Sequence, residues 1–337
     1  MPGRTVYEQG PAMYPESPLM PPFAETILVV FTLIAIGYGA AALRVLKPET
    51  GDGLSDFVFT IAVPLLLFRI IATASFDHGA PWAVWAAYFT SVLVTWVSAH
   101  LIIRAGFGRD ARSGVVAGVT AGFSNLVLLG LPFITGVYGE DGLAILSQIV
   151  TIHLPIMMAA SVILFEWALK RDGAGTGGKS MMALLTGFLR QLFSNPLIVG
   201  ILCGFIVRMS GLEIPRIADR VIGSLGGVAG PVALFAMGVS LRGYGIRGQV
   251  PQALSLVTLK LMLMPAVALG MALVLGLPEL QAKVVVAAAS LPAGVNSWLI
   301  ASRLGTGQRL ASSSMTLGTA LAAATTGLWL LIAEAVL

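Results

Sequence analysis

The chain has 337 residues, of which 57% are hydrophobic and 11% charged, and its formal net charge is +4. Its mean hydropathy is +0.90. A soluble domain carries about a quarter charged residues, so this composition excludes a soluble globular protein and indicates an all-α polytopic membrane protein. The expected surroundings are a lipid bilayer. Nucleic acid is not an expected partner, because the basic residues form no cluster with interleaved aromatic side chains.

Ten apolar segments follow a proline-rich start. Residues 1–23 have no apolar core and are expected to form a disordered tail. Candidate transmembrane helices lie at about residues 24–44, 54–74, 83–104, 113–138, 142–169, 195–211, 217–241, 250–276, 279–302 and 309–335. Residues 24–169 and 195–337 therefore hold five spans each. Residues 170–194 form a cytoplasmic linker, in which the stretch ALLTGFLRQLFS is expected to lie along the membrane interface.

The loop charges predict an orientation. Thirteen Lys and Arg residues fall in alternate connections, among them the linker, and five fall on the opposite side. Cytoplasmic loops carry the excess of Lys and Arg. We therefore expect both termini outside, the linker in the cytoplasm, and a place in the plasma (inner) membrane.

Three features recur at an offset of 167 residues. Gly37-Tyr38 corresponds to Gly204-Phe205, PLLLF at residues 64–68 to PVALF at residues 231–235, and GFSNLVLLGLPF at residues 122–133 to SLPAGVNSWL at residues 290–299. Because each half holds an odd number of spans, the second half starts from the opposite side of the membrane. The repeats are then inverted, which is typical of secondary transporters.

The third pair of segments carries proline, glycine and polar residues in the middle of an apolar span. Pro132 and Pro292 each remove a backbone donor and disfavour helical geometry in the preceding residue. Gly130 and Gly294 lower the cost of irregular backbone. The sequence therefore predicts that both helices, the fourth and the ninth, are broken, although proline and glycine also kink membrane helices that bind nothing.

Broken helices imply a binding site. Peptide groups that leave a helix inside the membrane must face protein, water or a ligand. Half-helix N-termini favour an anion, and neutral side chains add hydrogen bonds. We predict a site for a small organic anion near the membrane midplane, formed by Ser124, Asn125, Gly130, Pro132, Pro292, Gly294, Asn296 and Ser297.

Two further titratable residues fall inside predicted spans. Burying a cation in a membrane makes a functional role the default, so Lys260 is a candidate for attracting an anion or pairing with an acid, with snorkelling to the interface as the alternative. His153 is a candidate for relaying a proton or binding a carboxylate, with a hydrogen bond to a neighbouring helix as the alternative.

Several motifs together resemble a known family. FVFTIAVPLLLF, SNLVLLGLP, NPLIVG, GPVALFAMGVSL and SLPAGVNSWLIA, in this order and spacing, resemble the auxin efflux carrier family, especially its short bacterial members. The resemblance covers about residues 24–337. It implies two inverted five-helix repeats whose broken helices 4 and 9 cross at the substrate site, with Pro132 and Pro292 as crossover prolines and Asn125 facing the substrate.

The resemblance also implies how the protein works. Spans 1, 2, 6 and 7 would form a scaffold, with a possible homodimer through spans 2 and 7, and the other spans a moving transport domain. The chain lacks the long hydrophilic central loop of the plant carriers, which favours a small carboxylate such as malate or malonate over auxin.

The sequence thus favours a secondary active or facilitative transporter of a small organic anion with an elevator mechanism. A sodium-coupled organic anion symporter of the bile acid type shares the crossover and is one alternative; a membrane channel or receptor is another. An intramembrane enzyme would need a Ser/His dyad, paired aspartates or a His-Glu metal motif. None occurs in the sequence, so no enzymatic activity, metal or cofactor is predicted.

Overall fold

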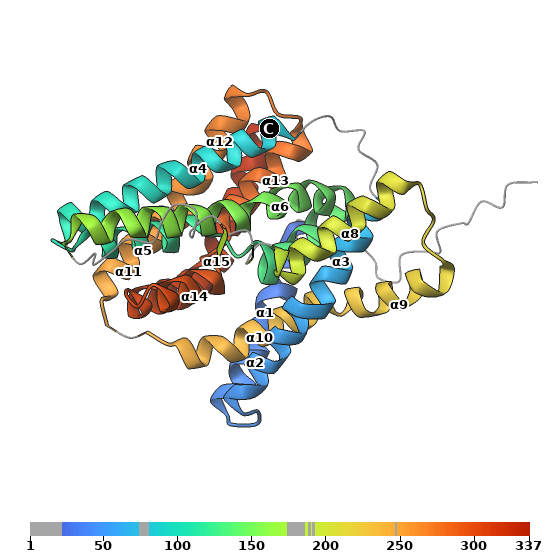
Figure 1. The fold of residues 1–337 in the computed structure, drawn as a ribbon, viewed down its shortest axis with the longest axis horizontal. Helices are drawn as coiled ribbons and strands as arrows, with labels where there is room; N and C mark the ends of the chain where they lie inside the picture. Colours follow the sequence, from blue (N-terminus) through green and yellow to red (C-terminus); the bar gives the residue numbers. More distant parts are fainter. Residues whose placement is uncertain (1–21, 74–80, 174–185, 188–189, 191–192, 247) are drawn as a thin grey trace, which may run out of the picture.

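Helices are the only regular elements in the part of the chain that the structure describes (Figure 1). The computed structural model describes residues 22–73, 81–173, 186–187, 190, 193–246 and 248–337. Nearly all of the predicted tail and most of the linker lie outside these ranges, including seven of the twelve residues of the expected interfacial helix. The described residues form an all-helical membrane protein, as the composition predicts.

The first half of the chain contains long helices with short π-helical segments. α1 (Pro22–Ala42) is followed by α2 (Pro48–Phe57), η1 (Val58–Ala62) and α3 (Val63–Thr73), which run on from one another. α4 (Trp82–Leu101) continues into η2 (Ile102–Gly106). α5 (Ala111–Gly122) is separated by a break from η3 (Leu126–Gly130), which continues into α6 (Leu131–Arg171).

The second half has a similar order. α8 (Pro196–Ser210) precedes α9 (Arg216–Gly227) and α10 (Ala229–Tyr244). α11 (Val250–Thr258), η4 (Leu259–Leu263) and α12 (Met264–Val274) run on from one another. α13 (Glu279–Ser290) and α14 (Val295–Arg303) are separated by a second break, and α15 (Gln308–Val336) closes the described chain.

Seven of the described helices are long and apolar enough to cross a membrane. The hydropathy of the sequence indicates ten segments, and helix breaks together with the short α8 account for the difference. α5, α13 and α14 are half-length helices on either side of a break, and α8 has only 15 residues. α6 joins two predicted spans, because the chain turns at Gly139 (φ 63°, ψ −156°) without ending the helix.

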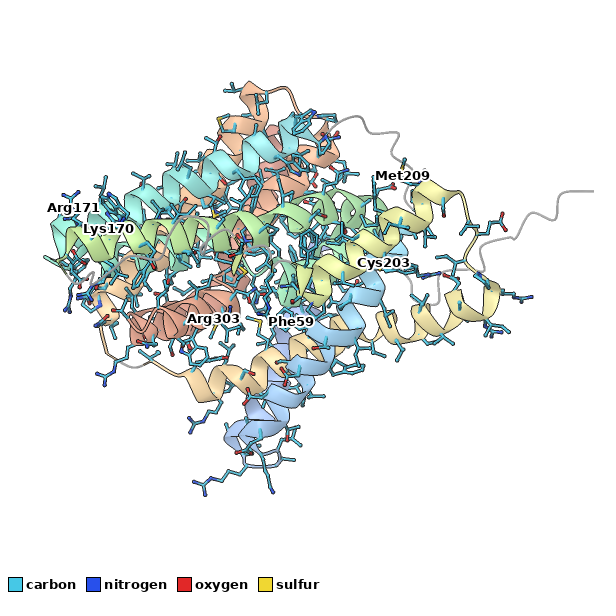
Figure 2. All side chains as sticks on the ribbon, viewed as in Figure 1. Phe59, Lys170, Arg171, Cys203, Met209 and Arg303 are labelled. Carbon is cyan, nitrogen blue, oxygen red and sulfur yellow. The ribbon has the colours of Figure 1, made fainter. Side chains whose placement is uncertain are left out.

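The described helices pack as two groups. In one group α1 lies along α10 and α3 lies along α8, with α2 and α9 beside them. In the other, α4, α5, α6, α11, α12, α13, α14 and α15 pack on one another. In Figure 1 the first group is at the lower right and the second at the left and top. Figure 2 shows Lys170 and Arg171 at one end of α6 and Met209 at the opposite side of the molecule.

Glycines allow the helices of the first group to touch backbone to backbone. A Cβ on Gly37 would lie 2.1 Å from the Phe235 carbonyl oxygen, and one on Gly204 would lie 2.6 Å from that of Phe68. Small residues let membrane helices approach closely. The two contacts are related by the 167-residue offset, since residue 37 corresponds to 204 and residue 68 to 235.

We predict that Gly37→Ala destabilises the protein and that Gly39→Ala does not. The new methyl group at Gly37 meets backbone that cannot yield without separating α1 from α10, at a cost of about 1–3 kcal/mol. A Cβ at Gly39, on the same helix, meets nothing within 4 Å. The apparent melting temperature of each variant in detergent measures the effect. Equal melting of the two variants would contradict the close packing of α1 on α10.

Asp172 ties the end of α6 to the start of α5. Its Oδ1 accepts from the Ala111 N–H at 3.0 Å, and its Oδ2 accepts from the Arg112 N–H and Nε, each at 3.1 Å. These are backbone donors that a first helical turn leaves unpaired. Burial by itself raises the pKa of Asp172, but the backbone and guanidinium hydrogen bonds outweigh it and hold the pKa below its usual value.

We predict that Asp172→Asn lowers stability by about 1–2 kcal/mol at neutral pH, because an amide caps the helix with one oxygen and no charge. Since folding lowers the pKa of Asp172, its contribution is complete above the unfolded value and is lost as the pH falls through the folded one. The difference in melting temperature between wild type and variant should stay constant from about pH 7 to pH 5 and shrink below about pH 4. A difference that grows below pH 4 would contradict this assignment.

Candidate functional site

Two helix breaks form the centre of the molecule. α5 ends at Gly122, and Phe123 (φ −88°, ψ 94°) and Asn125 (φ −78°, ψ 64°) leave the helical conformation before η3 begins. α13 ends at Ser290, and the chain runs extended to Gly294 (φ −83°, ψ 161°), where α14 begins. Both predicted broken spans are therefore interrupted in the structure.

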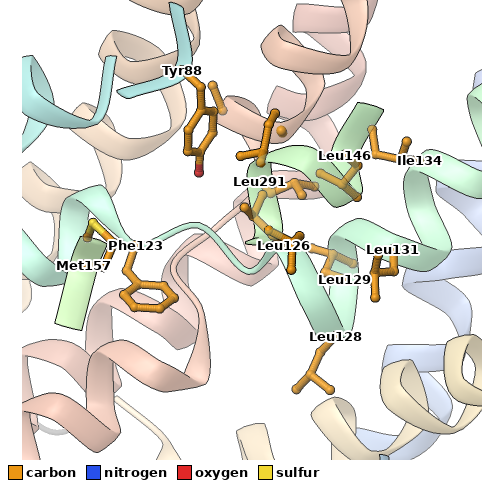
Figure 3. Close-up of a cluster of buried hydrophobic side chains, with 14 of the residues drawn as sticks. Tyr88, Phe123, Leu126, Leu128, Leu129, Leu131, Ile134, Leu146, Met157 and Leu291 are labelled. Atoms are coloured by element: carbon orange, nitrogen blue, oxygen red, sulfur yellow. The ribbon is translucent and has the colours of Figure 1, made fainter. Parts of the chain in front are cut away.

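The two breaks pair with each other. The Asn125 N–H donates to the Pro292 carbonyl at 2.9 Å, and the Gly294 N–H donates to the Phe123 carbonyl at 3.0 Å. Ser124 and Ala293 form an antiparallel bridge between them. Figure 3 shows the two extended segments crossing between Phe123 and Leu126. Backbone groups that leave the helices thus satisfy one another inside the membrane protein, as hydrocarbon surroundings require.

Two of the helix ends created by the breaks face a small cavity of about 20 Å³. Its lining includes Asn125, Leu126 and Val127 at the start of η3, and Gly294, Val295 and Asn296 at the start of α14. The volume is enough for about one water molecule. Helix N-termini carry partial positive charge, so this cavity is where the breaks favour an anion.

Asn125 and Asn296 line this cavity from opposite breaks. Asn125 is 5% exposed, and its Nδ2 lies 3.3 Å from the Met237 Sδ on α10. Asn296 is half-buried in the first turn of α14. The structure therefore brings together two of the predicted site residues, on helices that are far apart in the sequence.

The remaining polar residues of the predicted site form hydrogen bonds within the protein. The Ser124 hydroxyl lines the cavity but accepts a hydrogen bond from Lys260 at 2.8 Å. The Ser297 hydroxyl donates to the Gly294 carbonyl of its own turn at 2.7 Å and is not part of the cavity lining. Pro292 lies in the second break, as predicted, and its carbonyl holds Asn125.

The predicted position of the first break is wrong. Gly130 is helical (φ −67°, ψ −47°), and Pro132 stands in the first turn of α6. Pro132 follows η3 almost directly, so it lies where the π-helical turn passes into α6 and not in a break. The chain unwinds instead at residues 123–125. Gly130 packs against Leu291 of the other break, and Pro132 lines a separate, larger cavity.

His153 lies beside the small cavity on α6. It is 3% exposed, and its ring packs edge-on against Phe123 with ring centroids 4.6 Å apart and against Tyr88 at 5.6 Å. Neither ring nitrogen has a hydrogen-bond partner among the described residues. The predicted alternative of a hydrogen bond to a neighbouring helix is therefore not found, and an unpaired imidazole lines the cavity together with Asn125.

Lys260 is buried, at 2% exposure, and does not snorkel to an interface. Its Nζ donates to the Ala289 carbonyl at 2.7 Å and to the Ser124 hydroxyl at 2.8 Å. Among the described residues it forms no ion pair with an acid. The ammonium group thus joins the last turn of α13 to the break that follows α5.

Sequence reasoning missed several residues of the site. Met237 contacts Asn125, Met264 lies 3.0 Å from the Lys260 Nζ, and Phe59 of η1 lines the small cavity. Three of the π-helical segments border the site: η1 through Phe59, η3 through Leu126 and η4 through Lys260. Single π-helical turns occur often at functional sites, but no residue pattern in these apolar stretches predicts them.

A second cavity of about 1070 Å³ lies between the two helix groups. It is lined by α1, α3, η3, the start of α6, α9 and α10. Glu25, Arg69 and Glu140 stand among its lining residues, as do Pro132, Gly230 and Pro231, which lie near the starts of α6 and α10. Val127 lines both this cavity and the small one.

Comparison with known proteins identifies the family of the chain. Residues 22–330 match the family model described as membrane transport protein. The chain belongs to this family, which includes the auxin efflux carriers. It is therefore a membrane transporter.

Individual relatives of this transporter cover nearly the whole chain. Auxin efflux carrier component 8 of Arabidopsis thaliana is 24% identical, over 88% of this chain and 93% of that protein. A putative malonate transporter of Rhizobium meliloti is 28% identical, over 91% and 94%. An uncharacterized transporter of Methanothermobacter thermautotrophicus is 28% identical, over 90% and 96%.

We predict that Gly294→Val destabilises the transporter by about 1–3 kcal/mol. A Cβ at Gly294 would lie 3.2 Å from the Asn125 Cα and 3.4 Å from the Ser124 carbonyl oxygen, so the valine methyl groups must push the two breaks apart. Gly270→Val on α12 is the control, because a Cβ there meets nothing within 4 Å. Melting temperatures in detergent make the comparison, and a Gly294 variant as stable as the control would contradict the paired breaks.

Proposed function

We propose that this transporter moves a small organic anion across the plasma membrane by elevator-type alternating access, and that the anion binds where the two broken helices cross. The carrying observation is that the N-termini of η3 and α14 line one cavity together with Asn125, Asn296 and the unpaired His153. Two partial positive charges and neutral hydrogen-bond donors around one small space suit a carboxylate.

An inverted repeat of residues 24–169 and 195–337 is the architecture proposed for this mechanism. The 167-residue offset relates the contact of Gly37 with Phe235 to that of Gly204 with Phe68. The same offset relates Asn125 to Pro292, which bond each other across the crossing. Transporters with inverted repeats bind their substrate at the repeat interface and alternate between two states by moving one part against the other.

The two helix groups support a division into scaffold and moving domain. The large cavity lies between the groups and reaches Val127, whereas the small cavity, which Val127 also lines, has room for about one water. On the orientation expected from loop charge, the large cavity opens outside. The carrier would then be open outward, and moving the second group would open the small cavity to the cytoplasm.

The charges around the large cavity argue against an anion site at its mouth. Arg69 is bonded to Asp219, with its Nε 2.7 Å from Oδ1, and Glu25 and Glu140 add two further carboxylates. The one cation of the lining is thus balanced by a neighbouring acid. A small anion would be held deeper, at the crossing.

Small carboxylates are the proposed substrate class. One relative is named as a putative malonate transporter and another as an auxin efflux carrier component, and both names denote or imply a carboxylate. The small cavity favours the shorter acid, since even a modest expansion admits malonate before it admits an indole ring. A homodimer through spans 2 and 7, at residues 54–74 and 217–241, stays a prediction of the family resemblance.

We predict that one acid stabilises the purified protein and that Asn125→Ala abolishes this effect. The panel holds malonate, malate, succinate, lactate, benzoate and indole-3-acetate, each as its sodium and its potassium salt. A ligand at about a hundred times its dissociation constant adds about 2.7 kcal/mol of stability. The same acid, radiolabelled, should enter proteoliposomes of the wild type at least tenfold faster than those of the variant.

Thr151→Ala is the matched control. Thr151 lies on α6 two residues before His153, but its hydroxyl donates to the Ser147 carbonyl and it does not line the small cavity. It should bind and transport like the wild type. Transport that survives in Asn125→Ala would contradict the crossing site. Uptake that requires the sodium salt would favour a sodium-coupled symporter, and uptake that does not saturate would favour a channel.

A further inference from the structure

Lys260 occupies a site built from both broken helices. Its ammonium group is bound by the Ala289 carbonyl, one residue before α13 ends, and by the Ser124 hydroxyl in the break after α5. The Met264 Sδ lies at 3.0 Å on its own helix. The lysine belongs to η4, one of the π-helical segments bordering the crossing.

The site is neutral apart from the lysine itself. No carboxylate of the described chain forms an ion pair with Lys260. The negative counterpart is instead the C-terminus of α13, which carries about half an elementary charge in its unpaired carbonyls. The Lys260 Nζ therefore rests on a half-helix end, with the Ser124 hydroxyl as its second oxygen and the Met264 Sδ as a third acceptor. Three acceptors match the three N–H donors of an ammonium group.

Oxygen donors of this kind are those that bind a small metal cation. Hard cations prefer carbonyl, hydroxyl and carboxylate oxygens, and in transporters with broken helices the unwound carbonyls and half-helix C-termini coordinate sodium or a proton. Here the lysine side chain reaches the same type of position and fills it.

We propose that the Lys260 ammonium is a tethered cation that takes the place of a coupling ion between the two broken helices. It neutralises the α13 end and holds the two breaks together in every step of the cycle. The carrier therefore needs no sodium, and the anion crosses uncoupled from it. This consequence for transport rests on the proposed function, whereas the tethered cation itself does not.

Melting in different cations tests the proposal without any substrate. The wild type should melt at the same temperature in sodium, lithium, potassium and choline chloride of equal ionic strength. Lys260→Ala leaves the Ala289 carbonyl and the Ser124 hydroxyl without their donor. In choline chloride this variant should melt at a lower temperature than the wild type. Sodium or ethylammonium should then raise its apparent melting temperature by about 3 °C or more at saturation, while choline, which has no N–H and is too bulky, should not.

Two variants separate charge from packing. Lys260→Arg keeps the cation and should melt close to the wild type, and Lys260→Met keeps the length without the charge and should melt lower. A melting temperature of Lys260→Met equal to or above that of Lys260→Arg would overturn the proposal. This comparison decides the proposal even if Lys260→Ala does not fold. Specific stabilisation of the wild type by sodium would also overturn it, as would a Lys260→Ala variant that responds to no small cation.

The two proposals fail separately. If no acid in the panel binds or is transported but the cation responses appear as expected, the tethered cation stands and the anion site falls. If an acid is transported only with sodium, the tethered cation falls and the crossing site stands.

Discussion

The antiparallel pairing of the two helix breaks is the constraint on which the rest of the structure depends. Bare peptide groups inside a membrane protein destabilise it by several kcal/mol unless they are bonded. Asn125 and Gly294 donate to Pro292 and Phe123 across the crossing, so each break supplies what the other lacks. Neither half-helix pair would be stable at this depth alone. The pairing also brings the starts of η3 and α14 to one cavity and leaves the end of α13 to Lys260.

Opposite ends of the half-helices thereby acquire different roles. The N-termini face a space that holds about one water molecule in this conformation and suits an anion. The α13 C-terminus is occupied by a buried ammonium from the same chain. In the proposed mechanism, positive charge is fixed at the end of α13, while an anion site at the starts of η3 and α14 can fill and empty. Close glycine contacts hold α1 to α10 and α8 to α3 beside this centre.

Composition alone predicts the all-helical membrane class, and the paired Pro, Gly and Asn segments predict that two spans are broken. The location of the first break is not predictable in the same way. Pro132 is accommodated where η3 passes into α6, and the unwinding at residues 123–125 depends on a partner segment that is 167 residues away. The partners of Lys260 are hidden for the same reason, because a backbone carbonyl and a serine hydroxyl leave no charge pattern in the sequence.

The most direct test of the crossing site is an experimental structure with a brominated acid bound, located by the anomalous scattering of bromine. The acid should be the brominated form of whichever compound stabilises the protein. The account predicts a bromine peak beside Asn125 and the starts of η3 and α14. A peak in the large cavity near Arg69, with none at the crossing, would contradict it.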